Sequence, residues 1–259
     1  SSNTAAVSPY MIKSVGAKYT LVGHSDNRSE GDTNEMLKYK VQFALKNNLK
    51  SSDNPFRHWE ISGPLTKGAI DEICNADIPD PRLDKLSYDG TRAIDGGEGG
   101  YREGIKDGGK AKNYRCFVNK DNANQFPNIL KFIQELQSPE VHQHIGKLIG
   151  KDLSKAFVRV EVICDREGFW LKPHCDIKEK LLSSIIFVNL TNESENLGTD
   201  FYDKNLKKIK TVPFKHNYGY FFTSGPDTWH GMEKKKIAKE RRCLQVNYVS
   251  FQTDWQVKN

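Results

Sequence analysis

Paired cysteines, long apolar runs and internal repeats are all missing from this sequence of 259 residues. Its five cysteines are scattered and never form a C-x-x-C pair, which argues against a structural zinc site and for reduced thiols in a cytoplasm. No run of about 18 apolar residues occurs that could span a membrane. The opening residues also lack the apolar core of a secretory signal. We therefore expect a cytoplasmic protein without a membrane span.

A modest positive charge gathers in two runs of the sequence. The net charge of +6 comes from 39 Lys and Arg against 33 Asp and Glu, and the excess lies at 204–210 and 234–242. No ladder of interleaved aromatic residues or known nucleic-acid-binding module accompanies these runs, so we interpret them as solvated loops. Nucleic acid is therefore not the expected partner, whereas an anionic substrate is compatible with the charge. Nothing in the sequence indicates an oligomeric state.

The first half of the sequence has the apolar spacing of helices. Helices are predicted over 32–49, 65–76, 125–137 and 138–150. The second has Thr66 as N-cap, and the last has Ser138 as N-cap, Pro139 in its first position and Gly150 as its stop.

Two further features of the first half are relevant to function. The glycine-rich segment at 89–110 has no periodicity and is predicted to be a long loop that could cover a site as a lid. His142 and His144 are two residues apart and therefore lie on different helix faces, so we interpret them as surface residues rather than a metal pair.

From about Phe157 the pattern changes to short strands. Segments rich in β-branched and aromatic residues are separated by turn residues, and six such strands within about a hundred residues favour a barrel or jelly roll. The predicted fold class is α+β, as a single domain over 1–259: a helical portion over 1–155 packs against a jelly-roll core over 156–252. The strands are predicted at 156–165, 181–190, 198–203, 207–212, 218–224 and 241–251.

Candidate metal ligands occur at the two ends of this strand-rich half. In the stretch F-W-L-K-P-H-C-D, His174 and Asp176 are two residues apart, so on an extended strand they point to the same face. His230 follows after about four predicted strands, enough to return the chain beside the first pair. Two imidazoles and one carboxylate on one face are typical of non-haem Fe(II) oxygenases. His216 is a weaker candidate because it lies in a predicted turn.

Arginine at the start of the last long strand is a candidate anion ligand. A buried Arg241 would form a bidentate clamp for a carboxylate. Arg242 must point to the opposite face, so only one of the two can lie inside.

The order of these motifs resembles the Fe(II)- and 2-oxoglutarate-dependent oxygenases, and within them the prolyl-hydroxylase-like branch. The resemblance covers about residues 157–251 and includes H-C-D at 174–176, T-W-H-G at 228–231 and R-x-C-L-Q-V-N-Y at 241–248. It implies a double-stranded β-helix, which is a jelly roll, and the cosubstrates 2-oxoglutarate and O2. Some members of this branch carry an aromatic hydroxyl where this chain has Cys164 or Phe187.

The resemblance also implies roles for individual residues. His174, Asp176 and His230 would bind Fe(II), and Arg241 would pair with the C5 carboxylate of 2-oxoglutarate. The predicted minor contacts are Ser183 and Gln245 to 2-oxoglutarate, and Asn247 and Trp170 to the substrate.

The predicted function is a dioxygenase that hydroxylates an unactivated C–H group and produces succinate and CO2. Its substrate, a small molecule or a protein side chain, is not identified by the sequence. Related halogenases replace the ligand carboxylate with a small residue, so Asp176 favours hydroxylation over halogenation. Desaturation and ring formation stay open. Two alternatives are a cupin-type metal enzyme, which would typically begin its ligands with His-x-His, and a non-catalytic metal-binding jelly-roll protein.

Overall fold

The computed structural model describes residues 48–78 and 115–259. The glycine-rich segment at 89–110 and nearly all of the helix predicted over 32–49 lie outside these ranges. The chain divides into two compact units, Ser1–Lys50 and Ser51–Asn259, and the fold described below is that of the second unit.

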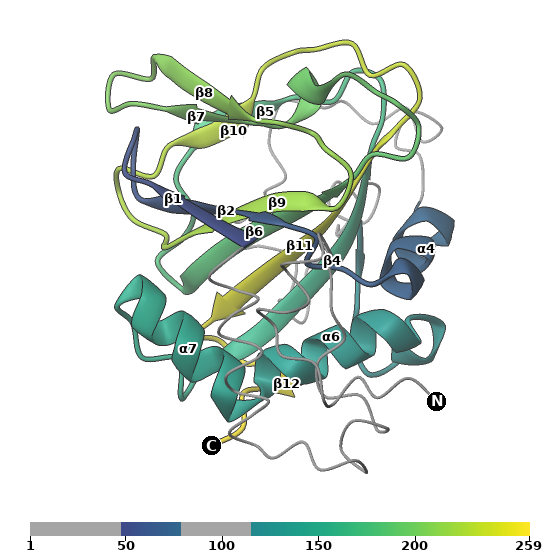
Figure 1. Cartoon of the computed structure of the whole chain (residues 1–259), viewed down its shortest axis with the longest axis vertical. Coiled ribbons are helices and arrows are strands. Elements are labelled where there is room, and N and C mark those ends of the chain that lie inside the picture. Colours follow the sequence, from purple (N-terminus) through teal and green to yellow (C-terminus); the bar gives the residue numbers. More distant parts are fainter. Residues whose placement is uncertain (1–47, 79–114) are drawn as a thin grey trace, which may run out of the picture. The chain divides into compact units, whose positions relative to one another are not determined.

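In the described part of the second unit, two antiparallel sheets lie one above the other (Figure 1). The larger sheet runs in the order β2-β9-β6-β11-β4-β12, with β3 also paired to β4; a further strand, β1 (Leu49–Ser52), lies across the division between the units. Its strands within the second unit are β2 (His58–Ser62), β3 (Arg115–Phe117), β4 (Phe157–Asp165), β6 (Lys180–Val188), β9 (Tyr218–Phe222), β11 (Arg241–Val249) and β12 (Trp255–Gln256).

The smaller sheet has four strands in the order β5-β10-β7-β8. They are β5 (Leu171–His174), β7 (Thr199–Tyr202), β8 (Lys208–Val212) and β10 (His230–Met232). The chain alternates between the sheets, since β6 and β9 belong to the larger sheet and β7 and β8 to the smaller one. Residues that are far apart in sequence therefore face each other across the space between the sheets.

In the described residues, three α-helices accompany the larger sheet (Figure 1). They are α4 (Lys67–Asn75), α6 (Pro127–Gln137) and α7 (Pro139–Ile149); two short 3-10 helices are η2 (Ala123–Gln125) and η3 (Glu195–Leu197). Within residues 48–78 and 115–259, no helix is both long and apolar enough to cross a membrane.

The helix termini follow the predicted capping. The Thr66 hydroxyl accepts a hydrogen bond from Ala69 N at 3.3 Å, and the Ser138 hydroxyl accepts one from Val141 N at 3.4 Å. Gly150 ends α7 with φ of 70°, a left-handed conformation that glycine adopts without steric cost.

Successive side chains of β11 point alternately to an outer and an inner face of the larger sheet. On the outer face, Leu244, Val246 and Tyr248 are at most 4% exposed, and the Tyr248 hydroxyl donates to the carbonyl oxygen of Leu136 in α6 at 2.6 Å. Burying each such side chain stabilises the fold by roughly 1.5–3 kcal/mol. The inner face carries Arg241 and the other alternate residues of β11 towards the space between the sheets.

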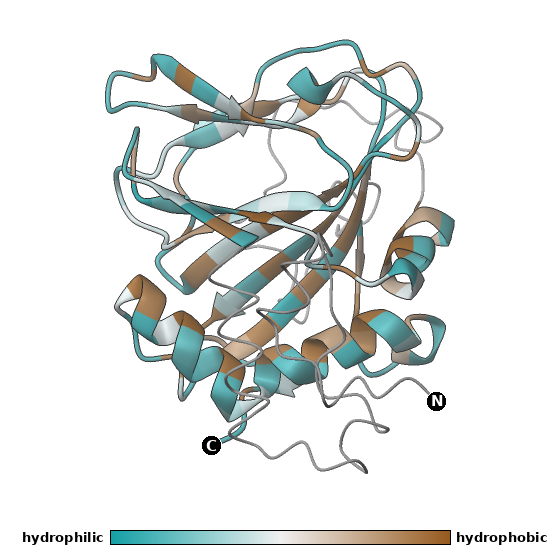
Figure 2. Ribbon diagram, in the orientation of Figure 1, coloured by the Kyte–Doolittle hydropathy of each residue, from teal (hydrophilic) through white to brown (hydrophobic). Residues whose placement is uncertain are grey.

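Aromatic side chains pack the space between the sheets. Phe201 of β7 lies edge-on to Tyr220 of β9, with ring centroids 5.1 Å apart, and Phe187 of β6 lies edge-on to Phe214 at 5.5 Å. Figure 2 shows hydrophobic residues along the central strands, interrupted by hydrophilic positions. Those hydrophilic positions on the inner face form the candidate site.

A polar contact also joins the sheets away from the aromatic packing. Lys210 of β8 donates to Glu60 of β2 at 2.6 Å, and the Tyr218 hydroxyl donates to the other oxygen of the same carboxylate. Because Glu60 is only 7% exposed, removal of its partners would leave a poorly solvated charge.

The fold confirms part of the sequence prediction. All six strands predicted after residue 156 are present, and so are the helices predicted over 65–76, 125–137 and 138–150. A mostly helical first half is not shown, because β2 and β3 lie within it and pair with later strands. The prediction of His142 as a surface residue is wrong: it is 2% exposed, and its Nε2 lies 2.8 Å from the carbonyl oxygen of Lys258.

We expect Gly219→Ala to destabilise the second unit strongly. A Cβ at this position of β9 would lie 2.2 Å from the carbonyl oxygen of Ile185, so the central ladder between β6 and β9 would have to move. The expected loss is about 3 kcal/mol in the free energy of unfolding, measured by urea denaturation. Gly225→Ala is the matched control, since its Cβ would meet nothing closer than 3.8 Å. Equal stability of the two variants would contradict the claim that β6 and β9 pack too closely at Gly219 to admit a Cβ.

Candidate metal centre

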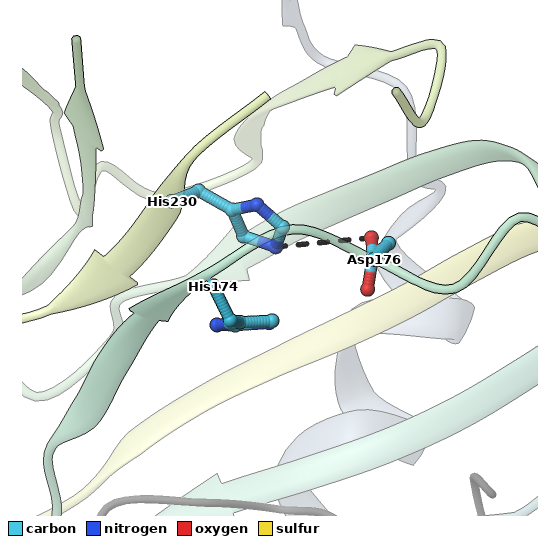
Figure 3. A group of neighbouring side chains, drawn as sticks. All are labelled: His174, Asp176 and His230. Carbon is cyan, nitrogen blue, oxygen red and sulfur yellow. Dashed lines mark ion pairs between the residues drawn. The ribbon is translucent and has the colours of Figure 1, made fainter. Parts of the chain in front are cut away.

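Antiparallel pairing of β5 with β10 brings the two candidate histidines together. His174 and His230 are direct partners across this pair, and their ring centroids are 4.3 Å apart. Asp176 follows β5 by two residues, and its Oδ2 lies 3.7 Å from His230 Nε2 (Figure 3). One ligand atom from each of the three residues lies within 4.8 Å of the others. The predicted triad is therefore assembled, although Asp176 lies after the strand rather than on it.

Backbone carbonyls fix the orientation of both imidazoles. His174 Nδ1 lies 2.8 Å from the carbonyl oxygen of Lys172, and His230 Nδ1 lies 2.9 Å from that of Thr228. A carbonyl oxygen only accepts hydrogen bonds, so each Nδ1 carries the proton and each Nε2 keeps its lone pair. Metal-binding histidines are oriented by this kind of contact. The site thus presents two Nε2 lone pairs and one carboxylate.

The protonation states of the triad also suit a divalent cation. Burial, and next the neighbouring His230, lower the pKa of His174 to about 4, and burial lowers the pKa of His230 as well. Burial alone would raise the pKa of Asp176, but the charge of Lys180 and the two imidazoles lower it well below its usual range. At neutral pH the site therefore consists of two neutral imidazoles and one anionic carboxylate.

Two neighbours hold the Asp176 carboxylate in place. The Ser183 hydroxyl of β6 donates to Oδ2 at 2.5 Å, and the ammonium group of Lys180 donates to Oδ1 at 2.6 Å. The carboxylate is about 6% exposed. Its orientation is thus set before any cation binds, which lowers the cost of ordering the site.

The triad opens onto a cavity of about 410 Å³ between the sheets. Apolar side chains of Phe169, Leu171, Ile185 and Met232 form part of its wall. Its polar lining is rich in cations: Arg115, Arg159, Lys172, Lys180 and Arg241, together with Thr199, Tyr220 and Gln245.

Arg241 lies inside this cavity, as predicted, and is 3% exposed. Its Nη1 donates to Asp165 Oδ2 and its Nε to the carbonyl oxygen of Leu197, both at 2.5 Å. The guanidinium also lies 5.1 Å from the ring centre of Phe187. These contacts fix a guanidinium at the cavity wall. Arg242 points to the other face of β11, where it donates to Glu240 at 2.8 Å.

The four predicted minor contacts have different surroundings. Gln245 lines the cavity, whereas Ser183 contacts the candidate metal ligand Asp176. Asn247 is fully buried on the inner face of β11, and Trp170 is half-buried with the ammonium group of Lys234 4.9 Å from its ring centre. Neither of these last two is among the described residues that line the cavity. The predicted cosubstrate and substrate roles of all four stay predictions.

Several residues that line the cavity were not predicted from the sequence. Lys180 follows Asp176 by only four residues, so its proximity could have been noticed. Tyr220 alternates with Tyr218 and Phe222 along β9, a pattern that predicts a shared face. Arg115 gave no local signal, because only the pairing of β3 with β4 brings it to the cavity. His216 lies in an exposed turn, as predicted, and takes no part in the triad.

We expect Ser183→Ala to weaken metal binding without unfolding the protein. It removes the hydroxyl that orients Asp176, and loss of such a partner typically costs about 10–100-fold in metal affinity. Titration of the metal-free protein with Mn(II), followed by electron paramagnetic resonance, measures the dissociation constant. Ser184→Ala is the control, because Ser184 is also buried but points to the outer face. An equal change in both variants would contradict a specific role for Ser183.

Comparison with known sequences concerns a different part of the chain. The triosephosphate isomerase family model matches residues 1–52. The triosephosphate isomerase of Ruthia magnifica is 55% identical over 47 residues, which are 18% of this chain and 19% of the isomerase. The chain thus spans about a fifth of the length of this curated relative. The match to triosephosphate isomerase does not support an oxygenase domain that includes the first 50 residues. The prediction of a single domain over 1–259 therefore stays a prediction.

Solved structures that resemble this chain are oxygenases. A prolyl hydroxylase from Trichoplax adhaerens, solved with a peptide fragment of a hypoxia-inducible factor, is 13% identical, with a TM-score of 0.48 over 90% of this chain and 95% of that one. A 2OG-Fe(II) oxygenase family protein from Burkholderia pseudomallei is 16% identical, with a TM-score of 0.41 over 54% and 66% of the two chains. The structural neighbours of this chain are thus prolyl hydroxylases and 2OG-Fe(II) oxygenases. Likenesses at this level concern the fold alone, so the chemistry of the site has to decide the function.

Proposed function

We propose that residues 51–259 form a dioxygenase that uses Fe(II), 2-oxoglutarate and O2 to hydroxylate an unactivated C–H group, with succinate and CO2 as coproducts. The observation that supports this proposal is the convergence of two oriented imidazoles and one carboxylate at a cavity that also holds a buried arginine. In this proposal the two facing sheets are the halves of a double-stranded β-helix, or jelly roll.

The donor set fits iron. Two neutral nitrogen donors and one carboxylate, gathered at the wall of the cavity, are the donor set that non-haem Fe(II) oxygenases use. His174, Asp176 and His230 would hold the ion, and iron bound there would supply the redox chemistry that couples O2 to decarboxylation of the cosubstrate. The protein contributes the fixed orientation of all three side chains.

Arg241 would bind the distal carboxylate of 2-oxoglutarate. A guanidinium that is buried at a cavity wall and already oriented by Asp165 and Leu197 loses little entropy when an anion binds. The Tyr220 hydroxyl, which donates to Thr199 at 3.0 Å, lines the same cavity and can accept or share a further hydrogen bond. Gln245 lies on the same face of β11, four residues further along.

The ion pair of Arg241 with Asp165 supports a second candidate function. The charge of Arg241 is already balanced by the fully buried carboxylate of Asp165, so the arginine needs no bound anion. A metal-binding protein that uses no cosubstrate could contain the same ion pair. The two candidates differ in whether 2-oxoglutarate binds to the metal-loaded protein.

The substrate and the cellular location are proposed in general terms. A small molecule or a protein side chain would reach the triad through the cavity, and hydroxylation is the proposed outcome. All five cysteines lie in the described part of the chain and form no disulfide there, which is in keeping with a cytoplasmic location.

The decisive experiment adds Fe(II) and then 2-oxoglutarate to the metal-free full chain without oxygen, while the visible spectrum is recorded. We expect a metal-to-ligand charge-transfer band in the wild type and none in His174→Ala, which lacks one of three ligands. Arg241→Gln should keep iron binding but raise the 2-oxoglutarate concentration needed for half of the band by at least about tenfold, because a charge-assisted bidentate contact is lost.

Arg242→Gln is the matched control for the arginine variant, since it removes the neighbouring charge on the outer face. It should change the 2-oxoglutarate requirement by less than about twofold. Iron binding without any band would favour the metal-binding protein over the dioxygenase. Absence of iron binding would overturn both.

A further inference from the structure

We infer that Lys180 is a positioning residue of the candidate metal centre: its ammonium group retains Oδ1 of Asp176, so that the carboxylate offers a metal ion Oδ2 alone. The inference rests on the proposed function for its catalytic meaning, because it concerns how many coordination positions stay free of protein atoms. Its test needs only the triad, since those positions can be counted without cosubstrate or reaction.

The two oxygens of the Asp176 carboxylate have different neighbours. Oδ2 lies 3.7 Å from Nε2 of His230, which is another candidate ligand atom (Figure 3). Oδ1 accepts a hydrogen bond from Lys180 Nζ at 2.6 Å. An oxygen that is bound to an ammonium group has to give up a charge-assisted hydrogen bond before it can bind a metal ion. The carboxylate is therefore set to bind through Oδ2.

Burial makes the ion pair of Lys180 with Asp176 hard to break. The two side chains are 13% and 6% exposed, so water cannot readily replace either partner. Burial alone would raise the pKa of Asp176, but Lys180, ahead of the two imidazoles, lowers it well below its usual range. The ammonium group is thus the strongest electrostatic partner of this carboxylate among the described residues.

The backbone around Lys180 fixes where its side chain starts. Lys180 is the first residue of β6, faces Val249 of β11 across the ladder, and donates its N–H to the carbonyl oxygen of Ile177 at 3.1 Å. Asp176 instead follows β5, a strand of the smaller sheet. A candidate ligand next to one sheet is therefore held by the first residue of a strand in the other.

Asp176 is the member of the triad for which such control matters. Nδ1 of His174 and Nδ1 of His230 are occupied by the carbonyl oxygens of Lys172 and Thr228, so each imidazole has one nitrogen left for a metal ion. A carboxylate has two potential donor atoms. Only Asp176 can therefore change the number of donors that the triad supplies.

Ser183 and Lys180 contact different oxygens of this carboxylate. The Ser183 hydroxyl donates to Oδ2 at 2.5 Å, and a carboxylate oxygen has a second lone pair that stays available to a metal ion. Loss of Ser183 would therefore change how well Oδ2 is oriented. Loss of the Lys180 ammonium group would instead release Oδ1.

Retention of Oδ1 keeps one more coordination position free. Three protein donors leave about three positions of an octahedral ion, whereas an Asp176 that binds through both oxygens would leave about two. In the proposed function, 2-oxoglutarate and O2 react at the iron, so a second aspartate oxygen would compete with them for positions.

The test counts the water molecules on Mn(II) bound to the metal-free full chain, from the broadening of electron paramagnetic resonance lines in water enriched in oxygen-17. We expect about three in the wild type and about two in Lys180→Met, which keeps the apolar stem but frees Oδ1. Lys180→Arg restores a charged donor and should return the count to about three.

Two variants serve as matched controls. Lys178→Met removes a lysine two residues away whose side chain is 92% exposed, and should keep the wild-type count. Ser183→Ala should also keep it, although binding weakens, because Lys180 still holds Oδ1. Affinity alone is not the readout for Lys180→Met, since loss of a positive charge and gain of a donor would both tighten binding.

Several results would overturn the role of Lys180. If it only balances charge or supports the fold, Lys180→Met keeps the wild-type number of waters. A decrease in Ser183→Ala equal to that in Lys180→Met would mean that Lys180 does not hold Oδ1 by itself. The wild-type count needs no variant to fold: about two waters there would show that Asp176 already binds through both oxygens.

The outcomes also separate this inference from the proposed function. If the counts are as expected but Fe(II) and 2-oxoglutarate give no charge-transfer band, the role of Lys180 stands and the dioxygenase fails. If the band forms and Lys180→Met keeps the wild-type count, only the role of Lys180 is wrong. Absence of Mn(II) binding in the wild type overturns the metal centre and the role of Lys180 together.

Discussion

The antiparallel pairing of β11 with β4 on one side and β6 on the other is the constraint on which the site depends. Direct partners across these ladders point to the same face, so the inner face consists of rows of side chains. One row pairs Arg241 with Asp165, and another joins Arg159, Asn247 and Ser183. A slip of β11 by one residue would turn Arg241 and Asn247 to the helix side. Apolar residues on the outer face, packed against α6, make that slip costly.

Several charged side chains are buried between the two sheets. The space between the sheets contains the guanidinium groups of arginines and the ammonium groups of lysines. They lie next to carboxylates that are almost inaccessible to water. Each carboxylate has a specific partner: Asp176 has Lys180, Asp165 has Arg241 and Glu161 has two arginines. Such pairs stabilise the fold little compared with apolar contacts, but they orient charged groups in advance of binding. Their common location at one cavity favours a binding role over a purely structural one.

Local patterns were enough to predict most of the elements. Alternating β-branched and aromatic residues marked the strands after residue 156, and Thr66, Ser138 and Gly150 marked helix ends. The strands that were missed, β1, β2, β3, β5, β10 and β12, are only two to five residues long, so they have few residues to show a period. His142 was misplaced because a single sequence does not reveal that the C-terminal segment covers α7.

By itself, the sequence determined which residues are candidate metal ligands and that Arg241 is a candidate anion ligand, because residue type, spacing and strand order all restrict those choices. Only the tertiary structure decided which side chains share the cavity with them. Arg115, Arg159 and Tyr220 lie on different strands, and the ladders that bring them together pair residues as far as 92 positions apart, as Val249 is from Phe157. Local sequence has no influence on such pairings, since they depend on the burial and register of whole strands. The physical reason is that a strand's pattern fixes which face is buried but not which strand will lie beside it.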